Sequence, residues 1–357
     1  MRPFQVVVYG ATGFCGQLVC EYLAKNYATT GLRWALAGRS EPKLISLKRS
    51  LGPGGGDTPH LVADAADTPA LEALARVADV VVAAAGPYGE VGSGLVAACA
   101  ATGTHLVDLA GESVWMKEMI EKHHDTASVS GAKIVHSCGF DSIPADLGTM
   151  LAHMRLRDVH NTKTKALSYY FGKFGLGGFS GMLERQQLRG DVLRPLSAVA
   201  QRRAAPSATK NTQVCRFRGQ LAGLLPALLT TAAVAFSNAL FYLPPTRALL
   251  QQVAPASGEG PPASIRENSF FEIYVEGHGA NGAHVLATVG SDKGDAGYQE
   301  TCKMLAESAL ALALNTTALP QRTGILTPAS ALGMVLVERL RAAGMVLSVE
   351  TVSLPSG

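Results

Sequence analysis

The sequence predicts an α/β protein, with a doubly wound parallel sheet in its first half and a second α/β or α+β domain that has a mixed or antiparallel sheet. Three observations support this. An apolar strand leads into a glycine-punctuated turn near the amino terminus, strand and helix patterns alternate to about residue 145, and two alternating apolar runs separated by glycines follow residue 269. Alternating strands and helices are typical of parallel sheets covered on both faces.

The turn after the first strand has the spacing of a dinucleotide-binding motif. Val6, Val7 and Val8 form a β-branched run, and a GxxGxxG pattern follows before an amphipathic helix. The first glycine permits a tight turn, the second lets a pyrophosphate approach, and the third lets the helix pack on the strand. Free N–H groups at the helix start stabilise a phosphate. The segment predicts a Rossmann-type domain, with a purely structural glycine turn as the alternative. The cofactor contacts predicted here are Gly10, Thr12, Gly13, Phe14 and Gly16.

The end of the second predicted strand indicates which dinucleotide binds. This strand covers Leu32–Ala37, and Gly38, Arg39 and Ser40 follow it. No carboxylate stands there to hold the ribose 2′-hydroxyl of NAD. An arginine at this place pairs bidentately with a 2′-phosphate, and a serine hydroxyl adds a donor. The three residues therefore predict NADP(H) as the cofactor, and the alternative is that Arg39 is a solvated loop residue.

Four further strands complete a predicted sheet of six parallel strands. They cover His60–Asp64, Ala78–Gly86, Gly103–Asp108 and Lys133–Cys138. Ligands of such sheets bind outside the carboxyl ends of the strands. Residues at these ends predict one crevice: Asp64, Gly86, Pro87, Tyr88, Asp108 and Gly139–Asp141. Of these, Asp64, Gly86 and Pro87 are assigned to the cofactor site, although Asp and Gly also serve as helix caps and turn formers.

Bulk properties are those of an ordinary enzyme. The 357 residues suffice for two domains, predicted as 1–145 for NADP binding and 146–357 for substrate binding and dimerisation. Without CxxC, HExxH or finger-like spacing, we expect no metal site. Six scattered cysteines favour a reducing compartment. The first strand begins close to Met1, so we expect no signal or transit peptide.

An apolar segment distinguishes the second half from a plain dehydrogenase. Residues 219–246 carry no charge and are long enough to span a bilayer, which needs about 20 residues. A transmembrane helix, a buried core helix and a membrane-dipping lid over an apolar substrate are the three interpretations. Residues 185–218 contain eight Lys or Arg and one Asp, so they either attract anionic lipid head groups or form a solvated loop. The basic strip contains a single aromatic residue, Phe217, which argues against nucleic acid.

The motifs together resemble the saccharopine dehydrogenase-like oxidoreductases. The resemblance rests on GATGFCG (10–16), AGRS (37–40), AAGPY (84–88), VDLAGE (107–112) and GFDSIPAD (139–146), and it extends to 294–298 and 324–333. This family includes lipid-droplet-associated animal members and mycobacterial trans-acting enoyl reductases. The resemblance implies an NADP-binding Rossmann domain followed by an α/β domain that shapes the substrate cleft. It supplies no reaction, because the family spans amino-acid and lipid chemistry.

The resulting prediction is an NADP(H)-dependent oxidoreductase that transfers hydride to or from a hydrophobic, lipid-linked substrate, as an enoyl reductase does. Tyr88, Asp108 and Asp141 are the candidate catalytic residues, by position alone. The alternatives are a saccharopine-type imine reductase and a non-catalytic NADP-binding protein of lipid surfaces. We expect a small-molecule or lipid-linked substrate, a homodimer, and a location at the cytoplasmic face of a membrane or lipid droplet, otherwise the cytoplasm.

Overall fold

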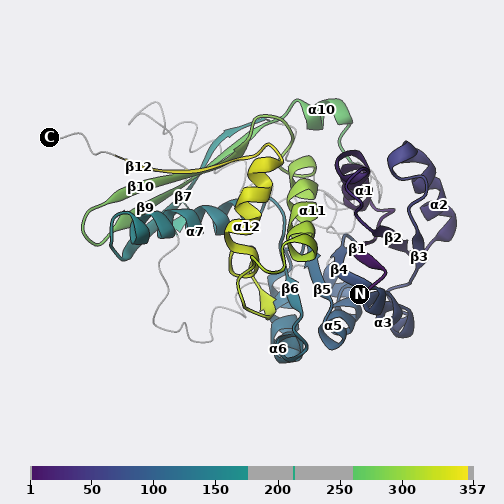
Figure 1. Ribbon diagram of the computed structural model, residues 1–357. Coiled ribbons are helices and arrows are strands. Elements are labelled where there is room, and N and C mark those ends of the chain that lie inside the picture. Colours follow the sequence, from purple (N-terminus) through teal and green to yellow (C-terminus); the bar gives the residue numbers. More distant parts are fainter. Residues whose placement is uncertain (1, 176–211, 214–259, 353–357) are drawn as a thin grey trace, which may run out of the picture.

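A computed structural model describes residues 2–175, 212–213 and 260–352, which form two sheets and their covering helices (Figure 1). The strands of the first sheet are β1 (Phe4–Tyr9), β2 (Trp34–Gly38), β3 (His60–Val62), β4 (Ala78–Ala83), β5 (His105–Asp108), β6 (Lys133–Val135) and β11 (Gly324–Leu326). The helices are α1 (Phe14–Tyr27), α2 (Glu41–Ser50), the 3-10 helix η1 (Gly52–Gly54), α3 (Thr68–Val77), α4 (Tyr88–Val91), α5 (Ser93–Thr102), α6 (Ser113–Ser130), α7 (Ile143–Asp158), α10 (Ala263–Glu267), α11 (Gln299–Leu314) and α12 (Pro328–Ala342).

The first sheet confirms the predicted doubly wound topology. Its order is β11-β6-β5-β4-β1-β2-β3, and every neighbouring pair is parallel. The structure adds a seventh strand to the predicted six, because β11 pairs beside β6 at the edge. The predicted division at residues 145/146 stays a prediction, but β11 shows that the C-terminal part of the chain also contributes to the first sheet.

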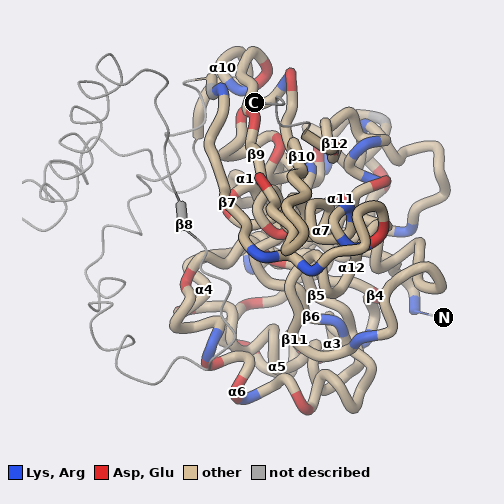
Figure 2. The backbone as a smooth tube through the Cα atoms, turned by 90° about the vertical axis from the view of Figure 1, so that its left-hand side faces the viewer, with Lys and Arg blue, Asp and Glu red and all other residues tan. Residues whose placement is uncertain are grey.

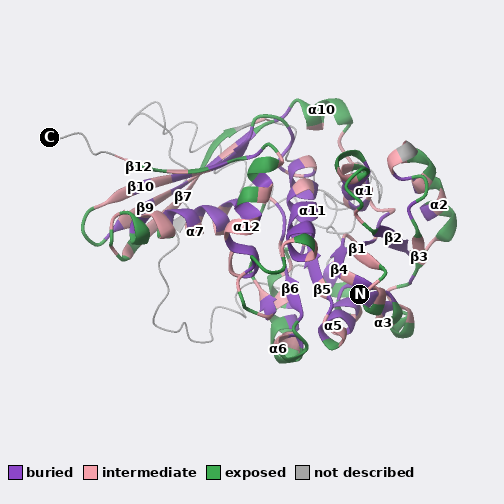
Figure 3. Ribbon diagram, in the orientation of Figure 1, coloured by how far each residue is buried: buried purple, intermediate pink, exposed green. Residues whose placement is uncertain are grey.

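The unbroken valine run of β1 is explained by helices on both faces of this sheet. Val6 and Val8 belong to the core under α1, α2, α11 and α12, whereas Val7 faces the core under α3, α5 and α6. All three side chains are fully buried. Burying one such side chain stabilises the fold by about 1.5–3 kcal/mol. The central strands and most of α11 are buried (Figure 3).

The second sheet is mixed, as predicted. Its strands are β7 (Thr164–Phe174), β8 (Thr212–Gln213), β9 (Phe271–Gly279), β10 (His284–Ser291) and β12 (Val346–Thr351), in the order β12-β10-β9-β7-β8. Only the β7–β8 pair is parallel among the described strands. The two alternating apolar runs after residue 269 correspond to β9 and β10, which pair as an antiparallel hairpin. Helix α7 packs on β9, β10 and β12.

Charged residues are distributed over many elements. Lys and Arg, like Asp and Glu, are scattered along the described backbone (Figure 2). In the described part of the chain, no helix has the length and apolarity needed to cross a membrane. The apolar segment 219–246 and the basic segment 185–218 lie outside the described residues.

A buried carboxylate connects α1 with the two C-terminal helices. Glu307 of α11 is 1% exposed, and its Oε1 accepts hydrogen bonds of 2.7 Å from the hydroxyls of both Tyr22 and Tyr27 in α1. Its Oε2 accepts a 2.8 Å hydrogen bond from Nε of Arg339 in α12. Arg339 also donates to the Tyr27 hydroxyl at 3.0 Å. These four side chains form one polar network at the edge of the apolar core, and Arg339 extends it by a 3.0 Å hydrogen bond to Oδ1 of Asn315.

Glu307→Ala should lower the free energy of unfolding by about 3–5 kcal/mol, because it leaves the Arg339 charge without its partner in a buried site. Glu338→Ala is the matched control: Glu338 pairs with Arg341 but is 63% exposed, so its loss should cost at most about 1 kcal/mol. Urea denaturation monitored by circular dichroism measures both. Equal losses in the two variants would contradict the importance of the buried network.

Candidate active site

The carboxyl ends of the seven parallel strands bring the predicted site residues to one edge of the sheet. Gly10 follows β1, Gly38 ends β2, and Asp64 follows β3. On the other side, Asp108 ends β5 and Gly139 lies beyond β6. The shared edge follows from the parallel pairing alone, so the sequence could predict it.

The glycine turn has the geometry that a pyrophosphate requires. Gly10 has φ +80°, and a Cβ there would lie 2.7 Å from the backbone N of Ala85. A Cβ on Gly16 would lie 2.1 Å from the carbonyl O of Gly10, so only glycine lets α1 begin so close to the strand. Gly13 differs, because its φ is −76° and a Cβ would come no nearer than 3.3 Å to the Gly10 oxygen. Position 13 is therefore left without a side chain where a phosphate approaches.

The start of α1 is suited to an anion. Gly13 is its N-cap, no side chain caps the helix, and no acidic residue lies in its first turn. Hydrogen bonds within the turn stabilise it: the backbone N–H of Gly13 donates to Gly10 O at 3.0 Å, and the side-chain amide of Gln17 donates to Thr12 O at 2.9 Å. These observations fit a dinucleotide phosphate at this helix N-terminus.

Arg39 lies in the corner where the predicted 2′-phosphate belongs. The residue is exposed in the loop between β2 and α2. Burial raises the pKa of Tyr9 to about 12, the Asp64 carboxylate adds to this, and the Arg39 charge opposes it, so all three groups share one neighbourhood. Ser40 is the N-cap residue of α2, and its side chain forms no capping hydrogen bond. Asp64 is exposed and accepts a 2.9 Å hydrogen bond from the N–H of Ala66.

Phe14 connects the glycine turn to the C-terminal part of the chain. Its ring packs edge-on against Tyr298, with centroids 4.8 Å apart, and the Arg266 guanidinium lies 5.5 Å from its centroid. A Cβ on Gly260 would lie 2.3 Å from the same ring. The Phe14 ring therefore packs against other residues of the protein, so a contact of Phe14 with the cofactor would be made by its backbone atoms.

Tyr88 is a buried structural group after the cis Gly86–Pro87 bond. Its hydroxyl donates to Ala83 O at 2.8 Å and accepts from the N–H of Leu109 at 3.0 Å. Burial and then the nearby Asp108 raise its pKa well above the usual value. Tyr88 and Asp108 line a cavity of about 10 Å³, which is room for about one water molecule.

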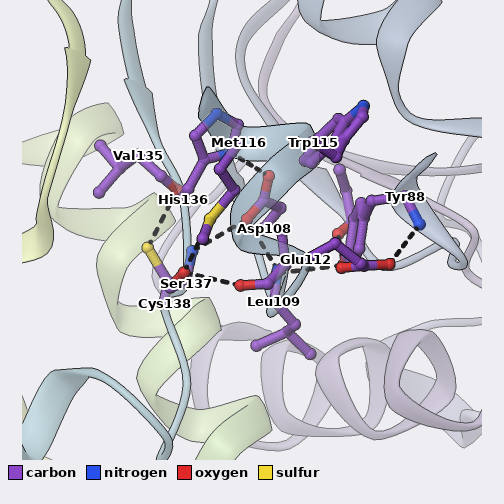
Figure 4. Close-up of polar contacts among 12 residues, drawn as sticks. Tyr88, Asp108, Leu109, Glu112, Trp115, Met116, Val135, His136, Ser137 and Cys138 are labelled. Atoms are coloured by element: carbon purple, nitrogen blue, oxygen red, sulfur yellow. Dashed lines mark hydrogen bonds and ion pairs between the residues drawn. The ribbon is translucent and has the colours of Figure 1, made fainter. Parts of the chain in front are cut away.

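Asp108 is the centre of a buried polar cluster (Figure 4). One carboxylate oxygen accepts hydrogen bonds of 3.0 Å from the N–H groups of Ala110 and Ser137. The other lies 2.6 Å from Nδ1 of His136, whose ring packs against Trp115. Asp108 is 0% and His136 6% exposed, and no described residue forms a hydrogen bond with Nε2 of His136. Ser137 adopts φ +62°, a rare value for a residue other than glycine.

Asp141 is the predicted catalytic residue that reaches the surface. The residue is exposed, yet the surrounding protein desolvates its carboxyl enough to raise the pKa. Tyr169 of β7 lies close enough that Asp141 contributes to its raised pKa, after burial. The turn is fixed from α11, since the N–H of Phe140 donates to Oγ1 of Thr301 at 3.1 Å. Asp141 thus faces a strand of the second sheet, whereas Tyr88 and Asp108 face the interior.

Comparison with known proteins identifies the family. Residues 6–135 match the saccharopine dehydrogenase NADP-binding domain. A Mycobacterium tuberculosis protein provisionally named a trans-acting enoyl reductase is 35% identical, with 99% of each chain covered. The chain belongs to the saccharopine dehydrogenase-like oxidoreductases. A Mycobacterium leprae trans-acting enoyl reductase is 32% identical over 99% of both chains.

The solved structures agree on the fold. Apo saccharopine dehydrogenase (L-Glu forming) from Saccharomyces cerevisiae matches with a TM-score of 0.56 and 16% identity, covering 98% of this chain and 99% of that one. This saccharopine dehydrogenase-like protein is therefore an oxidoreductase with NADP as its cofactor, as the sequence predicted. The roles of the individual site residues stay predictions.

Three residues at this edge were not predicted from the sequence. His136 follows a buried strand, but only the structure shows that it pairs with Asp108. Glu112 accepts the N–H of Tyr88 at 2.9 Å from the next loop. Tyr169 comes from the second sheet, and no sequence spacing relates it to Asp141. His136 and Glu112 were findable in principle, because each lies within a few residues of a predicted strand end.

Arg39→Asp should weaken NADPH binding at least tenfold and NADH binding much less. A charge-assisted pair with a 2′-phosphate contributes about 1.5–3 kcal/mol, and NADH has no such phosphate. Fluorescence titration measures both affinities. Arg33→Asp, at the opposite end of the same strand, should change neither. Equal losses for both cofactors in the Arg39 variant would exclude the 2′-phosphate role.

Gly13→Val should abolish binding of both cofactors and leave the fold largely intact. Its Cβ would lie 3.3 Å from the Gly10 oxygen, which a shift of a few tenths of an ångström relieves, but its methyl groups would occupy the pyrophosphate position. Gly16→Val should instead destabilise the protein, since its Cβ would collide with the Gly10 carbonyl. Thermal melting and cofactor titration separate the two effects. Unchanged affinity in the Gly13 variant would remove the assigned phosphate site.

Proposed function

We propose that the protein uses NADPH to reduce the carbon–carbon double bond of a hydrophobic, lipid-linked enoyl substrate. The carrying observation is 35% identity over 99% of the chain to a trans-acting enoyl reductase relative. In this reaction NADPH gives a hydride to one carbon of the double bond and becomes NADP⁺. A proton from the protein or solvent adds to the other carbon, which completes the saturated product.

The proton is best supplied at Asp141. Of the three candidate catalytic residues, it alone is exposed at the carboxyl edge, whereas the oxygen atoms of Tyr88 and Asp108 are committed to internal hydrogen bonds. Its raised pKa keeps the carboxyl protonated to a higher pH than a free aspartate. Tyr169 is the neighbouring hydroxyl on the second sheet. Tyr88 and Asp108 then act as positioning residues of the sheet edge.

Aromatic side chains near Asp141 favour an apolar substrate. Phe140 packs edge-on against Phe271 at 4.9 Å between centroids, and Tyr169 does the same with Phe171 at 5.3 Å. Phe171 is 44% exposed. Large apolar groups at an exposed edge are suited to a hydrocarbon chain.

The proposal includes a lipid surface. The uncharged segment 219–246, with its basic neighbour 185–218, would place the protein at the cytoplasmic face of a membrane or lipid droplet without crossing it. Apolar burial at about 25 cal/mol per Å² and about 1 kcal/mol per basic residue both favour such contact. A substrate held in the lipid phase would then be presented directly to the enzyme.

The chain should oxidise NADPH in the presence of a 2-enoyl thioester. Oxidation should be faster with a long-chain thioester held in anionic liposomes than with a short, soluble thioester. Mass spectrometry should find a product two hydrogens heavier than the substrate. Asp141→Asn should lower kcat about 100-fold or more with unchanged NADPH affinity. In the wild type, kcat should fall as pH rises through the raised pKa of Asp141, because the donor loses its proton, and the variant should lack this dependence.

Asp125→Asn makes the same change on an exposed aspartate of α6 and should keep full activity. If Asp141→Asn behaves like this control while the enoyl substrate is reduced, only the donor assignment fails. NADPH oxidation with an amino acid and a keto acid instead would favour the saccharopine-type imine reductase. No oxidation with either substrate would favour the non-catalytic NADP-binding protein.

A further inference from the structure

The outer face of the β9–β10 hairpin gathers three metal-ligating side chains. Residues of β9 alternate between the α7 face, where Val275 and Gly277 are buried, and the opposite face, which carries Glu276 and His278. His284 of β10 is the register partner of His278. The period of two along one strand and the hairpin register together place one carboxylate and two imidazoles side by side.

The distances between these groups are those of a ligand set. Nε2 of His284 lies 2.6 Å and Nε2 of His278 lies 3.7 Å from the same oxygen, Oε1 of Glu276. The two imidazole rings are stacked, 4.5 Å apart and within 13° of parallel. One ligand atom from each residue lies within 4.8 Å of the others. Two ligand atoms on one tetrahedral zinc ion are about 3.3 Å apart, which lies between the 2.6 Å and 3.7 Å separations found here.

An ordinary ion pair does not account for the cluster. One histidine suffices to pair with Glu276, yet a second imidazole is stacked on the first with the ring centroids 4.5 Å apart. Both ring nitrogens of His284 are shielded from solvent, and its Nε2 lies 2.6 Å from Oε1 of Glu276. Nitrogen atoms in this state are available as metal ligands.

The carboxylate also has the support that metal ligands usually have. Tyr170 of β7 donates a 2.8 Å hydrogen bond to Oε2 of Glu276, which leaves Oε1 toward the two histidines. A ligand fixed by a second group is typical of protein metal sites.

We propose that Glu276, His278 and His284 bind a divalent transition-metal ion, for which Zn²⁺ is the probe. Two imidazoles and a carboxylate are ligands of Zn²⁺, and they leave the fourth position for water. The site is separate from the cofactor edge, because it lies beside the hairpin turn of the second sheet. The bound ion clamps β9 to β10, and through Tyr170 it reaches β7. Sequence spacing predicted no metal site, so this proposal departs from that expectation.

Zinc binding to the full chain, freed of metal by a chelator, tests the proposal. Calorimetric titration with Zn²⁺ should find one ion bound by these residues, and Zn²⁺ should raise the melting temperature. His278→Ala and Glu276→Gln should each weaken binding at least tenfold and remove the thermal shift. Co²⁺ should give visible absorption bands of a nitrogen and oxygen site in the wild type and not in these variants.

His60→Ala is the matched control. His60 also lies near a carboxylate, 3.4 Å from Oε1 of Glu41, and should leave Zn²⁺ affinity and the Co²⁺ spectrum unchanged. His278 is 44% exposed, so its replacement should preserve the fold, which circular dichroism and NADPH affinity check. Absence of Zn²⁺ binding in the wild type, or equal binding in the wild type and a correctly folded His278 variant, would overturn the proposal.

Discussion

The buried carboxylate of Glu307 determines where the cofactor helix lies. A charge in an apolar core is costly unless hydrogen bonds and an opposite charge satisfy it. Tyr22, Tyr27 and Arg339 supply those partners, and two of them come from α1. The helix that begins at the pyrophosphate turn is therefore positioned by residues from the last sixth of the chain, so the amino-terminal motif does not form its site alone.

Local patterns predicted the parallel sheet because its signals are strong and short in range. Val6–Val8 and Val80–Val82 are buried on both faces, which produces continuous apolar runs, and glycine spacing marks the first turn. The strand β11 was missed because three residues, Gly324–Leu326, contain no periodicity to detect. Its place beside β6 depends on tertiary packing alone.

The polar sites were harder to predict because their members meet through register and fold. Asp108 and His136 are far apart in sequence, yet neighbouring strand ends bring them within 2.6 Å. Glu276, His278 and His284 meet across a hairpin, where the spacing depends on the length of the turn. The sequence motifs of known zinc sites, such as CxxC and HExxH, do not include ligands placed across a hairpin. The predicted positions at the sheet edge were thus found, whereas their partners required the structure.

Groups at the carboxyl edge divide into those that build the site and those left for ligands. Asp108 and Tyr88 are buried, and their oxygen atoms are engaged by nearby backbone groups and, for Asp108, by the ring of His136. Arg39 and Asp141 are exposed at opposite ends of the same edge. The internal hydrogen bonds hold the loops at this edge in place. Cofactor and substrate therefore bind to groups that are already positioned, and the loss of conformational entropy on binding is small.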